Sequence, residues 1–272
     1  MPWALNWLEM TKNDWDGAAY HRVSNPQFEW GLEVLGRLSL QGNETVLDAG
    51  CGTGRLTAKL LERLPHGRAI AVDASSSMLQ VARQYLVPLF GDRVSFLQAD
   101  LQGLSLEQVA DGIFSTATFH WIRDHAQLFV HLFAALRPGG FLIAQCGGAG
   151  NLSTFHERAT SFKASEPFAP YYRDWQEPWN YADAKTTEKR LRDAGFVDTR
   201  AEIKAAPSSF TNAKEYSDFI TAVVLRNHLA PLPDALRASF VAGMVEKAKA
   251  DNPPYTLDYR RLNLRAIRPP RT

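Results

Sequence analysis

Between about residue 44 and residue 146, short β-rich runs alternate with segments that carry apolar residues at helical spacing. The β-rich runs are residues 45–47, 69–72, 94–97, 112–115 and 141–144. The apolar stripes between them are Leu56, Leu60, Leu61 and Leu64, then Met78, Leu79, Ala82, Tyr85 and Leu86, then Leu128, Leu132, Phe133 and Leu136. Alternating strands and helices form a parallel sheet covered by helices on both faces. The sequence therefore predicts an α/β fold with one crevice at the carboxyl ends of its strands.

The remaining segments are expected to complete this fold. We expect residues 1–40 to be a helical segment that completes the pocket, residues 41–146 to be the ligand-binding core, and residues 147–272 to supply a lid, a helical insertion and the closing strands of the same domain. Residues 147–182 show no clear periodicity. The patterns beyond them predict helices at 184–194, 213–226 and 234–250 and strands at 196–203 and 257–267.

The first predicted strand ends in a glycine-rich turn, which reads Asp48-Ala49-Gly50-Cys51-Gly52-Thr53-Gly54 and leads directly into a helix. Three glycines at alternate positions let the backbone turn sharply and bring a ligand against the main chain. Dinucleotide enzymes also place such a turn between strand and helix, but their fingerprint has a later glycine that is missing here. The Asp48 carboxylate would repel a pyrophosphate and attract a ligand that carries an ammonium and a sulfonium.

Two more aspartates follow the next two predicted strands, Asp73 after the second and Asp100 after the third. A carboxylate at the first of these positions can accept both hydroxyls of a ribose, and one at the second can bind an adenine amino group. Each aspartate alone is often a cap of the following turn or helix. Three in order after successive strands favour a single nucleoside-containing ligand in the crevice.

Residues 46–54, 72–79, 99–101 and 136–140 resemble the ordered motifs of class I S-adenosylmethionine (SAM)-dependent methyltransferases. The resemblance implies a Rossmann-like, seven-stranded, mostly parallel sheet with one antiparallel strand, and SAM as cofactor with S-adenosylhomocysteine as product. It implies that the glycines line the methionine part of SAM near Asp48, that Asp73 holds the ribose, and that the backbone around Thr116 closes over the methionine. Met78 would pack on the adenine, and Asp100 with Leu101 would reach its edge. The expected cofactor-binding residues are Asp48, Gly50, Cys51, Gly52, Gly54, Asp73, Ala74, Met78, Asp100, Leu101 and Thr116.

A narrower resemblance starts at Phe119-His120-Trp121-Ile122 and continues through Asp124-His125 and Leu128-Phe129. This pattern is similar to the trans-aconitate methyltransferase group and, more distantly, to the insect juvenile hormone acid methyltransferases, which methylate carboxylates of small molecules. The second group has a Tyr-x₆-Gln arrangement that Tyr20 and Gln27 match. The resemblance implies that Gln27 and Trp121 present a polar group and an indole N–H to the acceptor oxygen.

The chemistry leaves the acceptor atom open. A carboxylate is already ionised at neutral pH and needs alignment rather than a base. A hydroxyl needs a base, and His120, just after the fourth strand, is the best-placed candidate. C- or N-methylation also remains open. His120 could instead cap a helix or back the cofactor, Trp121 could be core, and structural or surface roles are favoured for His21 and His125.

Aromatic residues gather in two segments. One group is Phe162, Phe168, Tyr171, Tyr172, Trp175, Trp179 and Tyr181, and the other is Trp3, Trp7, Trp15, Tyr20, Phe28 and Trp30. The first group is interpreted as a lid over the crevice, with a secondary core as the alternative, and the second group as the opposite wall. An enclosed, largely apolar pocket suits a small organic substrate.

The composition argues against several other functions. Lys and Arg number 30 and Asp and Glu 29, which gives no electrostatic reason to expect nucleic acid or an anionic membrane as partner. The one basic cluster is Arg260, Arg261, Arg265, Arg268 and Arg271, interpreted as an exposed edge strand rather than a phosphate-contacting tail. Two cysteines without zinc-like spacing predict no metal site, and the absence of a long apolar run predicts a cytoplasmic protein. The number of subunits stays open.

Two other classes of function compete with a methyltransferase. A nicotinamide-dependent oxidoreductase is disfavoured by the glycine spacing and by Asp48. A non-catalytic SAM-binding protein is disfavoured because the cofactor motifs are intact and an acceptor pocket is predicted beside them.

Overall fold

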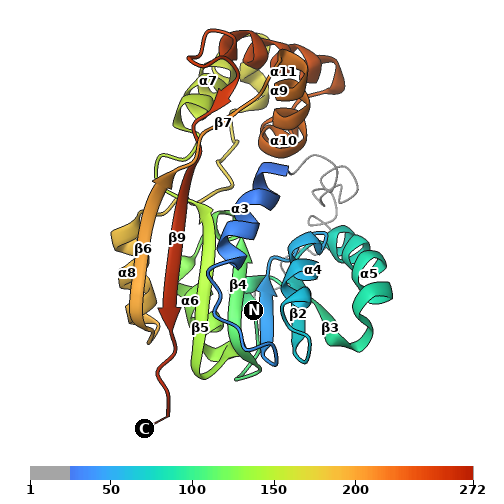
Figure 1. The fold of residues 1–272 in the computed structure, drawn as a ribbon. Helices are drawn as coiled ribbons and strands as arrows, with labels where there is room; N and C mark the ends of the chain where they lie inside the picture. The colour runs from blue at the N-terminus through green and yellow to red at the C-terminus, as the bar shows by residue number, and fades with distance from the viewer. Residues whose placement is uncertain (1–24, 272) are drawn as a thin grey trace, which may run out of the picture.

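The computed structural model describes residues 25–271, and its centre is a seven-stranded sheet with the strand order β3-β2-β1-β4-β5-β9-β6 (Figure 1). The strands are β1 (Thr45–Ala49), β2 (Arg68–Asp73), β3 (Val94–Gln98), β4 (Ala110–Thr116), β5 (Leu136–Gly147), β6 (Val197–Ala205) and β9 (Arg260–Ile267). Strands β1 to β5 pair in parallel, whereas β9 is antiparallel to both β5 and β6. This is the predicted Rossmann-like arrangement with a single antiparallel strand.

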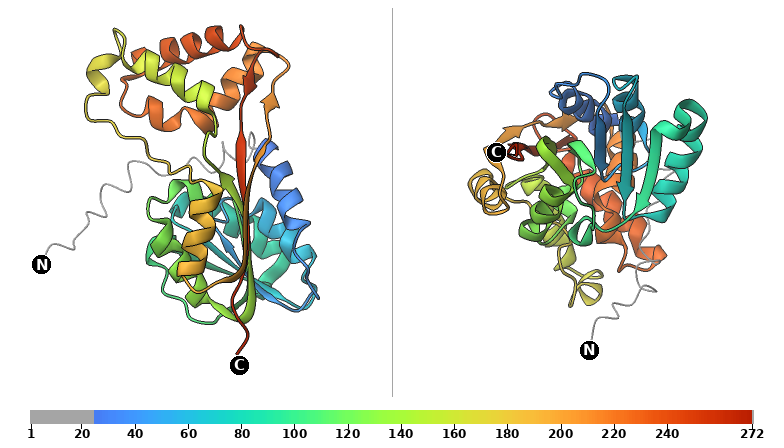
Figure 2. Two further views of the ribbon diagram at one scale, coloured as in Figure 1. Left: turned by 90° about the vertical axis from the view of Figure 1, so that its left-hand side faces the viewer. Right: turned by 90° about the horizontal axis from the view of Figure 1, so that it is seen from below.

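Helices cover both faces of the sheet. One face carries α3 (Asn25–Leu35), α4 (Arg55–Glu62) and α5 (Ser76–Phe90), and the other carries α6 (His125–Ala135) and α8 (Ala184–Asp193). The alternation of side chains along β1 assigns Val46 to the first face and Leu47 to the second. Both residues are fully buried, as expected of a strand covered on both sides. Seen edge-on in the left panel of Figure 2, the sheet is the middle of three layers.

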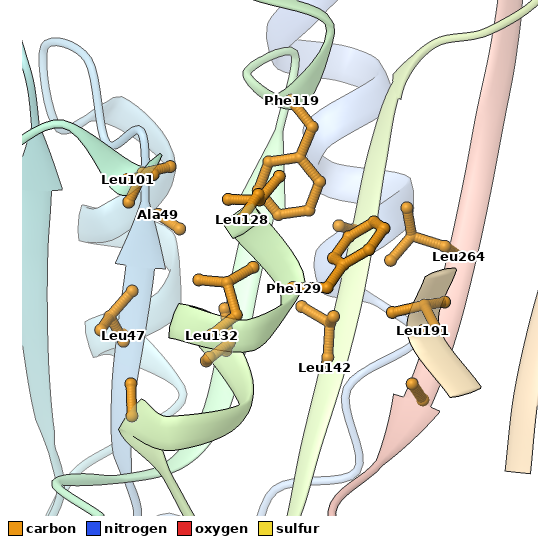
Figure 3. Packing of buried hydrophobic residues seen from close by; sticks show 14 of the residues in the cluster. Leu47, Ala49, Leu101, Phe119, Leu128, Phe129, Leu132, Leu142, Leu191 and Leu264 are labelled. Carbon is orange, nitrogen blue, oxygen red and sulfur yellow. The ribbon is translucent and has the colours of Figure 1, made fainter. Parts of the chain in front are cut away.

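The apolar residues that the sequence placed on one side of α6 form part of the core beneath this helix. Figure 3 shows Leu128, Phe129 and Leu132 pointing from α6 toward the sheet, where they meet side chains of β1, β5 and β9. Leu191 of α8 extends the same cluster beyond β5. Burial of these side chains stabilises the layer by roughly 1.5–3 kcal/mol for each large apolar residue.

Two segments of the chain form a separate substructure outside these three layers. We call it the cap and define it as residues 153–175 and 208–257. It contains α7 (Ser153–Lys163), α9 (Ala213–Phe219), the π-helix η6 (Ile220–Val224), α10 (Arg226–Leu229), α11 (Asp234–Ala248) and the short paired strands β7 (Ser208–Ser209) and β8 (Thr256–Leu257). Phe155, Tyr216, Phe240 and Met244 belong to its separate apolar core. Figure 1 shows the cap above the carboxyl end of the sheet.

Two expectations about these elements were wrong, and one helix formed where none was predicted. Residues 153–163 form α7, although their few apolar residues give a weak helical pattern. The segment 213–226 is not one helix, because a π-helical turn separates α9 from α10. The final strand is not an edge, since β9 lies between β5 and β6. Within residues 25–271 no helix is long and apolar enough to cross a membrane.

Candidate active site

The expected cofactor-binding residues lie together at the carboxyl ends of the parallel strands. Asp48 is the next-to-last residue of β1, Asp73 ends β2, Asp100 follows β3 by two residues, and Thr116 ends β4. Because these strands are parallel neighbours, their ends line one crevice, as the sequence predicted.

The glycine-rich turn is pinned to the end of β2 by main-chain contacts. The N–H groups of Gly50 and Cys51 donate to the carbonyl oxygen of Val72 at 2.8 and 2.9 Å. The N–H of Gly52 donates to Asp73 Oδ2 at 2.8 Å. The turn and the second strand therefore form one rigid wall of the crevice.

Two glycines of the turn, Gly50 and Gly52, differ in the space around them: one is required by packing and the other faces open space. A Cβ added to Gly50 would lie 2.1 Å from Thr118 Oγ1, so this glycine is required by the approach of the β4 loop. A Cβ added to Gly52 would meet nothing within 4 Å. Both residues have positive φ, +85° and +54°. Main chain that faces open space at the crevice is the cradle that the methionine part of SAM requires, so the residues present fit this cofactor.

Asp48 is an acid of the crevice whose pKa is strongly perturbed. Its side chain is buried and accepts a hydrogen bond of 2.6 Å from Thr57 Oγ1. Burial raises the pKa of Asp48 to about 7, the neighbouring Asp73 charge adds to the rise, and the Thr57 hydrogen bond opposes it. A cation bound beside this carboxyl would favour its ionised form, which suits the ammonium group of SAM.

Asp73 and Asp100 both hold turns, as the capping interpretation predicted. Asp73 Oδ1 accepts from the Ser75 N–H at 2.9 Å, and Asp100 Oδ1 accepts from the Gln102 N–H at 2.9 Å. A carboxylate oxygen accepts more than one hydrogen bond, so these contacts leave room for a ligand. Ala74 beside Asp73 is exposed, as is Asp100, whereas Met78 and Leu101 are buried behind them.

A cavity lies beside the crevice, between the sheet and the cap. It is lined by Gln27, Ala117, His120, Trp121, Asn151, Leu152, His156, Trp179, Tyr181, Val223, Val224, Tyr259 and Arg261. All three expected catalytic residues, Gln27, His120 and Trp121, therefore line the same cavity. The side-chain oxygen of Gln27 is buried and has no hydrogen-bond partner within the described residues. A buried amide oxygen in this state indicates a site for a polar ligand group.

His120 lies in the 3₁₀ turn η4 (Phe119–Trp121) and contacts the end of β5. Its Nδ1 accepts a hydrogen bond of 3.2 Å from the N–H of Gly147. Because Nδ1 is the acceptor, the neutral ring carries its proton on Nε2. Burial lowers the pKa of His120 well below its ordinary value, and the positive charge of Arg261 lowers it further. His120 is therefore a neutral N–H donor.

Aromatic rings form the rest of the wall around His120. The ring of Tyr181 stacks on it at 5.8 Å between centroids, and the ring of Trp121 lies 5.1 Å away. Trp179 meets Trp121 edge-on at 6.2 Å. A Cβ on Gly147 would lie 2.7 Å from the Tyr181 ring, so this close packing needs a glycine at the end of β5.

The aromatic segment divides between the two predicted roles. Trp179 and Tyr181 line the cavity, as expected of a lid, but Phe162, Phe168, Tyr172 and Trp175 pack in or against the cap core, as the alternative stated. At the other wall, Trp30 packs on Tyr259 at 4.8 Å. Trp3, Trp7, Trp15, Tyr20 and His21 lie outside the described residues. His125 is structural, since its buried Nε2 bonds the carbonyl oxygen of Phe119 at 2.9 Å.

The sequence interpretation missed Arg261, Asn151, His156 and Tyr259 as cavity residues. Arg261 was assigned to a solvated basic cluster, but it is only 4% exposed because β9 is an inner strand. In the same cluster Arg268 donates to carbonyl oxygens at the end of α6, and Arg260 and Arg265 are exposed. Across the described part of the chain, no three His, Cys, Asp or Glu side chains are grouped to hold a metal ion.

The fold, the glycine turn and the acidic crevice together define a SAM-binding methyltransferase, and the comparisons with known proteins agree. A family profile described as "Methyltransferase domain" matches residues 46–140. The trans-aconitate 2-methyltransferase of Methylobacterium radiotolerans is 31% identical over 258 residues, which cover 92% of this chain and 94% of that protein. The enzyme of the same name from Paracidovorax citrulli is 28% identical and covers 85% and 87%. The chain belongs to the same family of SAM-dependent methyltransferases as these relatives.

Solved structures show the same fold. Phosphoethanolamine N-methyltransferase 2 of Haemonchus contortus, solved with S-adenosylhomocysteine, superposes with a TM-score of 0.60 at 21% identity, over 94% of this chain and 57% of that one. Family and fold decide among the three classes of function that the sequence left in competition: the chain is a SAM-dependent methyltransferase rather than an oxidoreductase or a non-catalytic binder.

Proposed function

We propose that the chain methylates a carboxylate oxygen of a small organic acid. The relatives that cover most of the chain are trans-aconitate 2-methyltransferases, so trans-aconitate is the first acid to test. The observation that carries the proposal is the hydrogen bond from Gly147 N–H to His120 Nδ1.

This hydrogen bond gives His120 the chemistry of a donor. To accept a proton at Nε2, the ring would have to carry its hydrogen on Nδ1, where it would face the Gly147 N–H donor. A hydroxyl acceptor needs a base, whereas a carboxylate arrives ionised. The Nε2–H of His120 instead suits an acceptor oxygen that must be oriented without being protonated.

His156 and Tyr181, two other titratable groups of the cavity, are also poor bases. Burial lowers the pKa of His156 to about 4, and the charge of Lys163 adds to this effect. Such a group takes up a proton only weakly at neutral pH. Burial raises the pKa of Tyr181, so its phenol stays protonated. The described walls therefore favour an acceptor that has no proton to lose.

The chain would act by alignment. Bound SAM supplies an electrophilic methyl group on a sulfonium, with a neutral thioether as leaving group. Gln27, His120 and Trp121 bring an amide, an Nε2–H and an indole N–H to the cavity, where they would position the acceptor oxygen. The aromatic rings around them exclude water from the reacting atoms.

The decisive experiment is transfer of a radiolabelled methyl group from SAM to a panel of small carboxylic acids, phenols and amines. We expect label on the acids that is released by mild base, as an ester requires. Label on phenols or amines alone, or base-stable label on carbon, would contradict the proposal and leave the cofactor site intact.

Two variants test the donor role of His120. His120→Gln keeps an N–H donor and should retain most of the activity on acids. His120→Ala should lose roughly 10- to 100-fold in kcat/KM, as expected for one hydrogen bond to a charged group. His131→Gln, on α6 away from the cavity, is the matched control. Equal and severe loss in both His120 variants, with a kcat that rises with pH in the wild type, would indicate a base instead.

A further inference from the structure

We propose that Arg261 binds a second carboxylate of the acceptor, one that does not react, and so selects acids with more than one carboxylate. The inference rests on the proposed function and concerns the part of the same cavity that lies beside α3. Nothing in the sequence pattern pointed to it, because Arg261 was counted with the exposed arginines of the same strand.

Arg261 lies next to the expected reaction site through the pairing of β5 with β9. It is the direct antiparallel partner of Gly147, whose N–H holds His120 Nδ1. Burial is the main cause of the lowered pKa of His120 and of the raised pKa of Cys146; the positive charge of Arg261 adds to the first shift and opposes the second, so it acts on groups at this end of β5. A guanidinium and the proposed oxygen-positioning group thus share one end of the cavity.

A buried polar row fixes the direction of this guanidinium. Arg37 Nη1 donates to Asn263 Oδ1 at 2.5 Å, and Gln145 Nε2 donates to the same oxygen at 2.9 Å. These two donors set the orientation of both amides, since Asn263 Nδ2 then donates to the Arg261 carbonyl oxygen at 3.1 Å. The remaining amide oxygen, Gln145 Oε1, accepts from Arg261 Nε at 3.3 Å.

The ring of Trp30 supports the guanidinium from α3. The Arg261 Cζ lies 4.8 Å from the centroid of this ring, in a cation–π contact. A guanidinium is planar and presents its N–H donors within that plane, which is the geometry that binds a carboxylate with two parallel hydrogen bonds. The contacts with the Trp30 ring and with Gln145 together reduce the rotational freedom that binding would otherwise remove.

The charge of the cavity suits a polyanion. Among the described residues that line it, Arg261 carries a permanent charge and none is acidic. A second carboxylate on the acceptor would therefore meet a positive charge and no repelling carboxylate among these residues. With one carboxylate at Arg261 and another at Gln27, His120 and Trp121, the spacing between them decides which oxygen is methylated.

The first test uses the wild-type protein and matched acids. Crotonate and fumarate share a four-carbon skeleton, and fumarate carries a carboxylate where crotonate has a methyl group; trans-aconitate adds a third carboxylate. We expect kcat/KM for fumarate and trans-aconitate to exceed that for crotonate by at least tenfold. Equal values for crotonate and the polycarboxylates would overturn the inference while leaving the proposed function standing. Absence of ester from every acid would instead refute the proposed function.

The second test asks whether Arg261 is the residue that causes the preference for polycarboxylates over crotonate. Arg261→Gln should lower kcat/KM for the polycarboxylates by roughly 10- to 100-fold, mainly through KM, and change crotonate little. Arg261→Lys keeps the charge without the planar fork and should be intermediate. Arg265→Gln removes an exposed arginine of the same strand, which pairs with Asp198, and is the matched control. An equal fall for crotonate and for the polycarboxylates in Arg261→Gln would show a structural role only.

Gln145 is a positioning residue, and its variant tests the polar row. Gln145→Leu should raise KM for trans-aconitate and leave its kcat within about twofold, because the guanidinium remains present but less well oriented. SAM affinity measured by calorimetry should be unchanged in all of these variants, which controls for misfolding. A fall in kcat for crotonate as well would assign Gln145 to the fold rather than to Arg261.

Discussion

Asp48 shows how a single residue links the cofactor site to pH. Its carboxyl is buried in the crevice, and burial raises its pKa to about 7. Since the folded protein then holds this proton more tightly than the unfolded chain does, Asp48 lowers the free energy of unfolding as the pH rises from about 4 to about 7. A cationic ligand reverses this penalty by stabilising the carboxylate.

We therefore expect the affinity for SAM to rise as the pH increases from about 6 to about 8, with a proton released on binding below about pH 7. Asp48→Asn should bind SAM more weakly and show a nearly flat pH dependence in this range. Calorimetric titration in two buffers of different ionisation enthalpy measures both the affinity and the proton release. A pH-dependent affinity that persists in Asp48→Asn would assign the effect to another group.

Among single residues, the sequence predicts membership of the site only for those that belong to a local motif. Asp48, Gly52 and Asp73 follow strands in a fixed order, so their meeting in the crevice was predictable. Arg261 is different, because only the pairing of β9 with β5 brings it to His120. No local pattern distinguishes it from Arg265, which lies on the same strand and is exposed.

Among the elements, the turn between β1 and α4 has two functions that substitution can separate. Gly50→Ala should lower the free energy of unfolding by about 2–5 kcal/mol, since it combines left-handed strain with a clash against Thr118. Gly52→Ala has open space and should cost about 1–2 kcal/mol from strain alone. Yet its methyl group would project toward the cofactor, so SAM affinity should fall about tenfold or more.

Chemical denaturation and calorimetry on the same two variants give both quantities. If Gly52→Ala instead bound SAM with the affinity of the wild type, the open space beside Gly52 would not be part of the SAM-binding site.

The prediction of elements succeeded where apolar periodicity was strong. All strands of the sheet and the helices α4, α5, α6, α8 and α11 lie close to their predicted positions. Helix α7 was missed because Phe155 and Ala159 are its only buried residues, which leaves a short stripe. The break between α9 and α10 is a π-helical turn, which the apolar repeat of an α-helix does not reveal in the sequence.

On the scale of the whole molecule, the cap and the sheet have separate cores, and two histidines lie where the cap covers the cavity. His228 is fully buried, and neither ring nitrogen has a hydrogen-bond partner within the described residues. The ring of His156 lies 5.8 Å from it at a tilt of 36°; burial lowers the pKa of His156, the charge of Lys163 lowers it further, and that of Asp258 raises it. Burial holds both pKa values below the ordinary value, and for His156 the value is about 4.

A depressed histidine pKa stabilises the fold above the ordinary value and loses that contribution as the pH falls below it. We therefore expect the cap to open before the sheet between about pH 6.5 and pH 4. Hydrogen exchange should show α7 and α11 losing protection while β1 and β4 keep theirs. His228→Leu should shift the opening to lower pH, and His131→Gln should not. Simultaneous loss of protection in cap and sheet would show that they unfold as one unit.

The position of β9 has a consequence for the order in which the site is assembled. Strand β6 precedes β9 in the chain, yet among the described strands its sheet neighbour is β9 alone. The cofactor crevice is built from consecutive strands and can form early from contacts close in sequence. The acceptor cavity is complete only after β9 has paired with β5 and β6. Because the residues of the cap lie between β5 and β9 in the chain, this pairing closes a long loop and has a large entropic cost. A folding intermediate with the first five strands in place would thus hold SAM before it could distinguish one acid from another.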